Sequence, residues 1–354
     1  MILSLILWQL EVLPLLRENV KYYQENNYAQ LIRTIDLKNN FTNSDFVYVD
    51  EVAYDFLWRV QLKEPNIVLP NIGANIGEKY YVKPQDLPKN KNVLGPNAIL
   101  LRSKCNDTHF VYFRLSTSSY EKLVGASGQP KFNKTDLKKV SLFMPSLIEQ
   151  KRIAYFLALL EERIATQNKI IDKLQSLIKG IAQKIVHSNK TNVRLSECVE
   201  CSSSTLQESD VCEHGAYPVY GANGIVGYLD NYNTEGEAVY IIKDGSGVGS
   251  VSYVTGKCSA TGTLNTLQAK DGYSLQYLYY LLKVFNFEPY KTGMAIPHIY
   301  FKDYGKAKIF CPSYTEQLQY ARLLSAIDNK LSIEQNILTE LSLQKQYLLR
   351  QMFI

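Results

Sequence analysis

Two long segments of the chain carry apolar residues at the spacing of a helix seam. In the first, apolar residues recur between Ile153 and Ile185, and with Gln167 counted the spacing alternates between four and three positions, a pattern typical of a coiled coil. The positions that we expect to make the helix contact there are Leu157, Leu160, Ile164, Gln167, Ile171 and Leu174. A second segment repeats the pattern, and its expected contact positions are Leu324, Ile327, Leu331, Glu334, Leu338 and Leu341.

Each of these segments is preceded by the same short motif. Residues 145–150 read Pro-Ser-Leu-Ile-Glu-Gln and residues 312–317 read Pro-Ser-Tyr-Thr-Glu-Gln, at an offset of 167 positions. Serine is a favoured N-cap, and a glutamate in the first turn suits the positive end of a helix. The motif therefore predicts where both helices begin.

The long helices belong to a larger internal repeat. The alignment at this offset continues without a gap on both sides of the motif, and residues 68–82 resemble 240–254 further upstream. A repeat of this kind indicates two copies of one unit, each a globular domain followed by a helix. We therefore divide the chain into a first domain at 1–145, a first spacer helix at 146–190, a second domain at 191–311 and a second spacer helix at 312–354.

The order of these parts predicts an antiparallel helix pair. The second domain begins where the first helix ends and finishes where the second helix begins, and the two ends of a domain are often close together. The second helix should then return alongside the first, which relates the two units by an approximate two-fold axis. Equivalent central positions meet at such an axis, so Gln167 should lie next to Glu334. A polar residue in a seam commonly fixes its register.

Within the two domains, short strand-like runs alternate with glycine and asparagine turns. The runs lie at 46–49, 67–69, 99–102, 238–242 and 250–254, and helical patterns lie at 110–115 and 275–284. There is no regular alternation of strands and helices. The expected fold class is therefore α+β, with two mixed α/β domains joined by two long helices that form an antiparallel coiled coil in a pseudo-two-fold internal repeat.

The composition is that of a globular protein with a modest positive charge. Hydrophobic residues make up 46% of the chain, charged residues 21%, and the net charge is +5. Residues 191–312 contain 9 basic and 12 acidic side chains, so the chain is not a simple polycation. The six cysteines form no disulfide framework, which favours the cytoplasm. The apolar start at 1–16 is interrupted by Glu11 and Pro14, so we expect a packed segment rather than a membrane span.

No catalytic constellation stands out. Residues 245–249 have the glycine spacing of a nucleotide-binding loop, but a strand-like run follows where the phosphate would need a helix. We expect a tight turn between two strands there. Cys198, Cys201, Cys212 and His214 match no strong zinc template, so we expect no metal site and no catalytic residue. We also find no Asn-Pro-Pro-aromatic segment of the kind that adenine methyltransferases use.

Several segments together carry a family resemblance. They are the two Pro-Ser-x-x-Glu-Gln motifs, the first continuing as Lys-Arg-Ile to residue 153, and the stretches 28–37, 128–145, 217–228 and 238–249. In the order domain, helix, domain, helix, they resemble the specificity subunits of type I restriction–modification enzymes. Residues 1–27 do not resemble the usual opening of such a domain, so we expect the first domain to be divergent or truncated at its start.

The resemblance implies a non-catalytic, cytoplasmic DNA-binding subunit. Each domain would be a target recognition domain for one half of a split sequence in double-stranded DNA. The helices would fix the gap between the halves and dock two methyltransferase subunits, which transfer methyl groups from S-adenosylmethionine to adenine. Restriction subunits with translocase and nuclease activity would join them. S-adenosylmethionine, ATP and Mg²⁺ would bind to these partners, and no cofactor to this chain.

Two alternatives stay open at this point. The chain could serve a related system in which one partner chain both methylates and cleaves, or it could be a coiled-coil scaffold that binds no DNA. The Pro-Ser-x-x-Glu-Gln repeat argues against the scaffold.

Candidate DNA contacts lie in or beside turns, or in the matching segments around Pro130 and Pro297. Such positions let side chains reach phosphates and base edges. In the first domain the candidates are Arg33, Lys79, Arg102, Lys131 and Lys134. In the second domain they are Tyr220, Asn223, Lys243, Ser246, His298 and Lys302.

Overall fold

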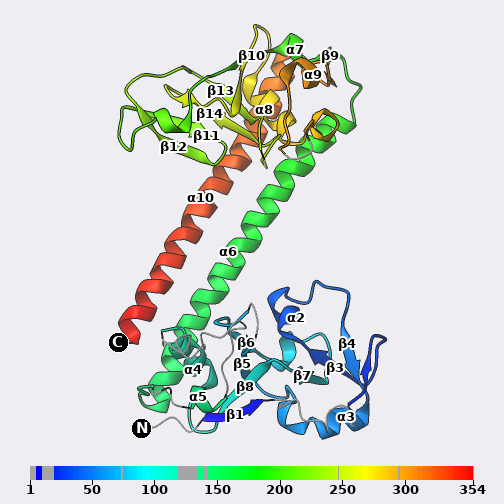
Figure 1. Cartoon of the computed structure of the whole chain (residues 1–354), viewed down its shortest axis with the longest axis vertical. Helices are drawn as coiled ribbons and strands as arrows, with labels where there is room; N and C mark the ends of the chain where they lie inside the picture. The colour runs from blue at the N-terminus through cyan, green and yellow to red at the C-terminus, as the bar shows by residue number, and fades with distance from the viewer. Residues whose placement is uncertain are drawn as a thin grey trace. The chain divides into compact units, whose positions relative to one another are not determined.

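The fold is taken from a computed structural model of the chain. It is described for residues 5–9, 20–72, 75–117, 134–138, 140, 142–245, 247–293 and 296–353. The chain forms two compact units, one made of residues 1–165 and 339–354 and the other of residues 166–338 (Figure 1). Each unit contains one globular domain together with a stretch of both long helices.

The first domain is built from two four-stranded sheets. Their strand orders are β1-β8-β5-β6 and β2-β4-β3-β7. The strands are β1 (Leu5–Gln9), β2 (Tyr22–Tyr23), β3 (Ala29–Ile32), β4 (Val47–Val49), β5 (Asn66–Pro70), β6 (Tyr80–Val82), β7 (Asn92–Leu94) and β8 (Ala98–Ser103). The helices and 3₁₀ turns are α2 (Thr34–Lys38), α3 (Glu51–Phe56), η1 (Trp58–Val60), η2 (Pro84–Asp86), α4 (Thr108–Leu115) and α5 (Lys134–Leu137).

The second domain repeats most of this plan, with one four-stranded and one three-stranded sheet, and adds a small two-stranded sheet. Its strand orders are β10-β16-β13-β14, β12-β11-β15 and β17-β9. The strands are β9 (Val193–Arg194), β10 (Val199–Ser203), β11 (Tyr217–Gly221), β12 (Gly224–Leu229), β13 (Ala238–Ile242), β14 (Val251–Val254), β15 (Ser259–Ala260), β16 (Leu264–Ala269) and β17 (Lys308–Ile309). The helices and 3₁₀ turns are α7 (Leu195–Cys198), η4 (Glu208–Asp210), α8 (Leu275–Lys283), η5 (Glu288–Tyr290) and α9 (Phe301–Tyr304).

The two domains share the pairing of one four-stranded sheet and of three strands of the other, β4-β3-β7 and β12-β11-β15, whereas β2 has no counterpart in the second domain. Ile67 of β5 pairs with Tyr81 of β6, and Val239 of β13 pairs with Tyr253 of β14, as the sequence repeat predicts. In the second sheet of each domain, β3 runs parallel to β7 and β11 runs parallel to β15. The predicted internal repeat is therefore confirmed at the level of sheet topology.

The apolar start of the chain contributes a sheet strand. β1 pairs antiparallel with β8, at the edge that β10 occupies beside β16 in the second domain. Among the described residues, no helix is long and apolar enough to cross a membrane.

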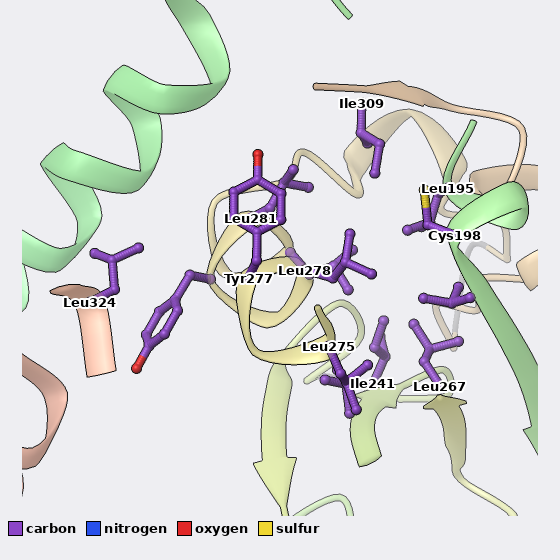
Figure 2. Packing of buried hydrophobic residues seen from close by; sticks show 14 of the residues in the cluster. Leu195, Cys198, Ile241, Leu267, Leu275, Tyr277, Leu278, Leu281, Ile309 and Leu324 are labelled. Atoms are coloured by element: carbon purple, nitrogen blue, oxygen red, sulfur yellow. The ribbon is translucent and has the colours of Figure 1, made fainter. Parts of the chain in front are cut away.

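A core of apolar side chains joins the second domain to its helices. Helix α8 begins after Ser274, whose side chain accepts a hydrogen bond from the Tyr277 amide, and buries Tyr277, Leu278 and Leu281. These side chains pack with residues of β13, β16 and α7 and with Leu324 of the second long helix (Figure 2). This contact fixes the domain to the helix mainly by burial of apolar surface.

The two long helices are α6 (Leu147–His187, 41 residues) and α10 (Tyr314–Met352, 39 residues). Each begins directly after the serine of its motif. The Ser146 and Ser313 hydroxyls accept the amides of Glu149 and Glu316 at 3.4 Å, and each carboxylate accepts the backbone amide of its serine. These reciprocal bonds form capping boxes, which confirms the predicted helix starts.

The predicted turn between two strands is also confirmed. Residues 243–250 connect β13 to β14, and the described residues of this turn form no helix that could hold a phosphate. Gly245 and Gly249 adopt φ values of 96° and 90°, a region that favours glycine. The glycine spacing therefore serves the hairpin.

Candidate nucleic-acid interface

In the second domain, the β13–β14 turn is held against residues 297–299. The Gly245 amide donates to the Pro297 carbonyl at 3.0 Å, and the Ile299 amide donates to the Lys243 carbonyl at 2.9 Å. Beside them, Nδ1 of His298 lies 2.6 Å from Oδ1 of Asp244. Segments about 50 residues apart in sequence thus form one surface that contains the predicted residues Lys243 and His298.

Aromatic and cationic side chains continue this surface. The His298 ring stacks with Tyr300 at a centroid distance of 6.5 Å, and Nζ of Lys302 lies 5.3 Å from the centre of the Tyr300 ring. Lys302 and Tyr300 are exposed. A cluster of this kind offers a cation for phosphate, an imidazole for hydrogen bonding and a flat ring for base contact.

Hydrogen bonds connect this turn to the β11–β12 hairpin. The Lys243 backbone amide donates to the Thr263 carbonyl at 3.0 Å, and the Thr261 backbone amide donates to the Tyr220 carbonyl at 2.9 Å. Lys243 and Tyr220 therefore flank the same short segment, and Asn223 is exposed at the hairpin tip. Burial raises the pKa of Tyr220, whose ring centroid lies 5.7 Å from that of Tyr240. The remaining candidate of this domain, Ser246, lies outside the described residues.

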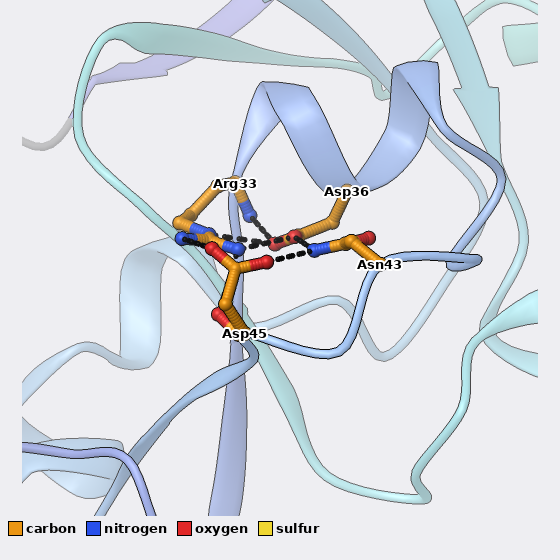
Figure 3. A network of polar contacts seen from close by, with 4 residues as sticks. All are labelled: Arg33, Asp36, Asn43 and Asp45. Carbon is orange, nitrogen blue, oxygen red and sulfur yellow. Dashed lines mark hydrogen bonds and ion pairs between the residues drawn. The ribbon is translucent and has the colours of Figure 1, made fainter.

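In the first domain, two of the predicted basic side chains, Arg33 and Arg102, bond to polar groups of the domain itself. Arg33 precedes α2, and its guanidinium bonds to Oδ1 of Asp36 at 2.7 Å and to Oδ2 of Asp45 at 3.2 Å (Figure 3). Asn43 donates to both carboxylates. The hydrogen bond to Asp36 raises the pKa of Arg33, and its charge is balanced by the two acids. The arrangement orders the loop after α2.

Arg102 of β8 is likewise enclosed by polar partners. Its Nε donates to Oδ1 of Asn66 at 2.6 Å and lies 3.2 Å from Oε1 of Glu64, and its Nη2 donates to the Gln61 carbonyl. Burial lowers its pKa. Lys131 and the side chain of Lys134 lie outside the described residues.

Lys79 stands beside a groove of the first unit that sequence reasoning missed. The groove has a volume of about 730 Å³ and lies between residues 37–41, β6, α4 and residues 155–165 of α6. In its wall the His109 ring stacks on Tyr81 at 4.0 Å and on Phe113 at 4.7 Å. Burial lowers the pKa of His109, which favours the neutral ring. The aromatic residues that line the groove come from four segments, around residues 41, 80, 110 and 155, so no local sequence pattern predicts that they lie together.

The residues considered for a zinc site do not gather. Cys198 is buried in the core of the second domain, whereas Cys212 is exposed. Within the described part of the chain, no group of three or more His, Cys, Asp and Glu side chains could hold a metal ion.

The predicted seam positions of the long helices turn inward. Leu157, Ile171, Leu324 and Leu331 are buried, as are both polar seam residues. Nε2 of Gln167 donates to the Glu334 carbonyl at 3.0 Å and to the Glu334 carboxylate, so the predicted meeting of these two residues is confirmed. The remaining seam positions are half-buried: Leu160, Ile164, Leu174, Ile327, Leu338 and Leu341.

Comparison with known proteins identifies the class. A family model described as the type I restriction modification DNA specificity domain matches residues 17–176 and again residues 187–343. These two matches span most of the chain and follow its internal repeat. The chain therefore belongs to the type I restriction–modification DNA specificity family.

Individual relatives share less than a third of their residues with the chain over the matched segments. The chain is 28% identical over 126 residues to the specificity subunit of the type I restriction enzyme EcoprrI from Escherichia coli, a match that covers 36% of this chain and 30% of that protein. A protein described as a type I specificity subunit from Mycoplasma genitalium is 23% identical over 273 residues, covering 70% and 71% of the two chains. The match thus spans less than a third of the E. coli relative.

A solved structure shares the fold of the whole chain. The crystal structure of a type I restriction–modification S subunit from M. genitalium superimposes with a TM-score of 0.65 at 16% identity. The match covers 99% of this chain and 96% of that one.

Proposed function

We propose that the chain is the DNA-specificity subunit of a type I restriction–modification complex, with each domain recognising one half of a split target. The observation that carries the proposal is that one sheet framework occurs twice with different side chains at the equivalent turn. After β13 the turn begins with Lys243 and Asp244, whereas after β5 it begins with Asn71 and Ile72. Different side chains at one framework position recognise different bases, so the two half-sites should differ.

The surface around Lys243, His298 and Lys302 is the proposed DNA contact of the second domain. It combines basic groups, which bind phosphates without regard to sequence, with an imidazole and an aromatic ring that can contact bases. In the first domain the exposed rim of the groove near Lys79 is the proposed contact. Arg33 and Arg102 would support it by ordering loops, because their guanidinium groups bind carboxylates and carbonyls.

The long helices are proposed to form one antiparallel coiled coil that spaces the two domains. Near Ala165 in the first unit, Nζ of Lys345 lies 2.6 Å from Oε1 of Glu161. In the second unit Gln167 bonds to Glu334. In the first unit a residue before the middle of α6 therefore contacts a residue after the middle of α10, and in the second unit two central residues meet, as an antiparallel pair requires. A continuous pair of this length would provide a stiff spacer.

The outer faces of the helices are proposed to dock two copies of one methyltransferase subunit. Phe156 on α6 and Leu323 on α10 occupy equivalent repeat positions and are 45% and 50% exposed. Leu147 and Tyr314 form a second equivalent exposed pair. Apolar side chains exposed at matching positions favour a partner that binds the same way twice. S-adenosylmethionine, ATP and Mg²⁺ would act on the methyltransferase and restriction subunits.

Replacing the second domain tests this function. A chimera in which residues 192–311 come from another family member should retain assembly with the methyltransferase subunits, because both helices are unchanged. Sequencing of modified bases in host DNA should then reveal a methylated motif in which one half differs and the other half and the gap are retained. A motif that changes in both halves, or in neither, would contradict recognition by two independent domains.

A salt titration on random duplex DNA gives an independent control. A DNA-binding complex should lose affinity steeply as the salt concentration rises, because phosphate contacts release counterions. A scaffold that binds no DNA would give no measurable binding at any salt concentration.

A further inference from the structure

The final glutamine of each Pro-Ser-x-x-Glu-Gln motif bonds to a second helix. Oε1 of Gln150 accepts the backbone amide of Asp107, the N-cap of α4, at 2.9 Å. Oε1 of Gln317 accepts the backbone amide of Ser274, the N-cap of α8, also at 2.9 Å. Asp107 and Ser274 are themselves equivalent positions, 167 residues apart. The two units therefore contain the same connection.

The other end of each amide holds the start of the long helix. Nε2 of Gln150 donates to the Pro145 carbonyl and Nε2 of Gln317 donates to the Pro312 carbonyl, both at 2.9 Å. In the first unit Nε2 also donates to Oδ1 of Asn106. The two glutamines are only 1% and 2% exposed. Each buried amide thus joins the N-terminus of a long helix to the N-terminus of a domain helix.

Glutamine suits this place because its amide accepts and donates at once. A glutamate would keep the acceptor but would set a carboxylate oxygen against the proline carbonyl. An apolar side chain of the same length would leave a buried backbone amide without its acceptor.

The domain helices carry the surfaces proposed to contact DNA. α8 packs on β13 and β14, the strands on either side of the turn at residues 243–250. α4 packs in the same way on β5 and β6. The apolar contact between domain and long helix, such as Tyr277 against Tyr320, is non-directional, whereas a hydrogen bond fixes direction and distance.

From this geometry we infer that Gln150 and Gln317 are positioning residues that set the angle of each recognition domain on its spacer helix. They act through α4 and α8 and need not touch DNA. This inference rests on the proposed function, because it supposes that the chain binds two half-sites. The two glutamine side chains would then determine how strictly the complex selects the gap between them. Loss of either bond should relax the preferred gap while the recognised bases stay the same.

The test uses Gln150→Met and Gln317→Met in the complete complex with its methyltransferase subunits. The DNA carries both half-sites of the methylated motif with the natural gap or with one base pair more or fewer. For the unaltered complex, affinity should be highest at the natural gap. In each variant the ratio of affinities between natural and altered gaps should fall by about threefold to tenfold, as expected when one or two hydrogen bonds no longer hold the orientation.

Two further variants separate positioning from folding. Gln319→Met makes the same chemical change at an exposed site of the same helix and should leave the ratio unchanged. Gln317→Glu keeps the size and the acceptor and should relax the gap even where Gln317→Met assembles poorly. Loss of stability alone lowers the folded fraction but does not alter a ratio measured on two DNAs.

The outcomes distinguish this inference from the proposed function. If the unaltered complex has no preferred gap, the proposed function itself fails. If it has one, and both Gln317 variants and Gln150→Met retain the full affinity ratio, the glutamines do not position the domains and the inference is overturned.

Discussion

At the scale of single residues, the repeated motif divides its work among three side chains. The serine and the glutamate close the first turn of each long helix through their reciprocal bonds. The side chain of the glutamine points away from its helix and accepts a backbone amide of the domain. The same six-residue motif therefore specifies both the start of a long helix and a contact with the domain, in both units.

The capping role predicts the effect of Ser313→Ala. Loss of the N-cap should destabilise the second unit by about 1 kcal/mol, the usual cost of removing a serine cap. The matched control is Ser332→Ala in the exposed interior of α10, where alanine is the better helix former and the effect should be neutral or slightly stabilising. Urea unfolding followed by circular dichroism would measure both. Equal effects from the two substitutions would exclude a capping role.

Several basic residues illustrate where residue type alone is insufficient. Arg33 and Arg102 have the chemistry of phosphate contacts, yet their hydrogen bonds go to acids and carbonyls of their own domain. The sequence around Lys243 and Lys302 does not set them apart from Arg33 and Arg102, but the fold brings these two lysines to one surface. Only the tertiary contacts distinguish the two cases.

At the scale of the helices, two polar residues of the seam, Gln167 and Glu334, meet each other. Gln167 donates to the backbone and to the carboxylate of Glu334, and Nζ of Lys330 lies 2.5 Å from Oε1 of the same carboxylate. All other seam positions named above are apolar. A buried polar pair costs stability compared with an apolar pair but penalises other registers, in which its groups would lose their partners.

This pairing predicts a strongly coupled double-mutant cycle. Gln167→Leu alone should cost about 1–3 kcal/mol, because it removes a donor from a buried carboxylate. Gln167→Leu with Glu334→Leu should be at least as stable as the first variant, because the seam becomes apolar throughout. Chemical denaturation measures the cycle, and Gln175→Leu, at an exposed position of α6, provides the control. Simple additivity of the two single effects would show that the side chains do not act as a pair.

At the scale of the whole molecule, the proposed spacing function predicts the effect of lengthening both helices. One heptad inserted into α6 and one into α10 keeps the seam on the same face and adds about 10 Å at 1.5 Å per residue. DNA rises about 3.4 Å per base pair, so the preferred gap between half-sites should grow by about three base pairs. Modified-base sequencing would report the new gap.

The control is an insertion of a few residues into one helix only. This shifts the seam out of register against an unchanged partner and should destabilise the protein. An active complex that carries both heptads and still methylates the original gap would mean that the helices do not set the spacing.

By itself the sequence determined the plan of the molecule. The heptad spacing and the repeated motif gave both long helices and their starts, and the offset of 167 residues predicted that Gln167 meets Glu334. The glycine turn at residues 245–249 was also predictable. These features follow from local periodicity, capping and chain order, which act over short distances or repeat along the chain.

Only the tertiary structure decided which side chains far apart in the sequence contact one another. His298 meets Asp244 across 54 positions, Asp107 meets Gln150 across 43, and Ser274 meets Gln317 across the same interval. No local pattern encodes these contacts, because they depend on how sheets and helices pack. The motif repeats the glutamine in both copies, but only the tertiary structure shows that it bonds to the N-cap residues of α4 and α8.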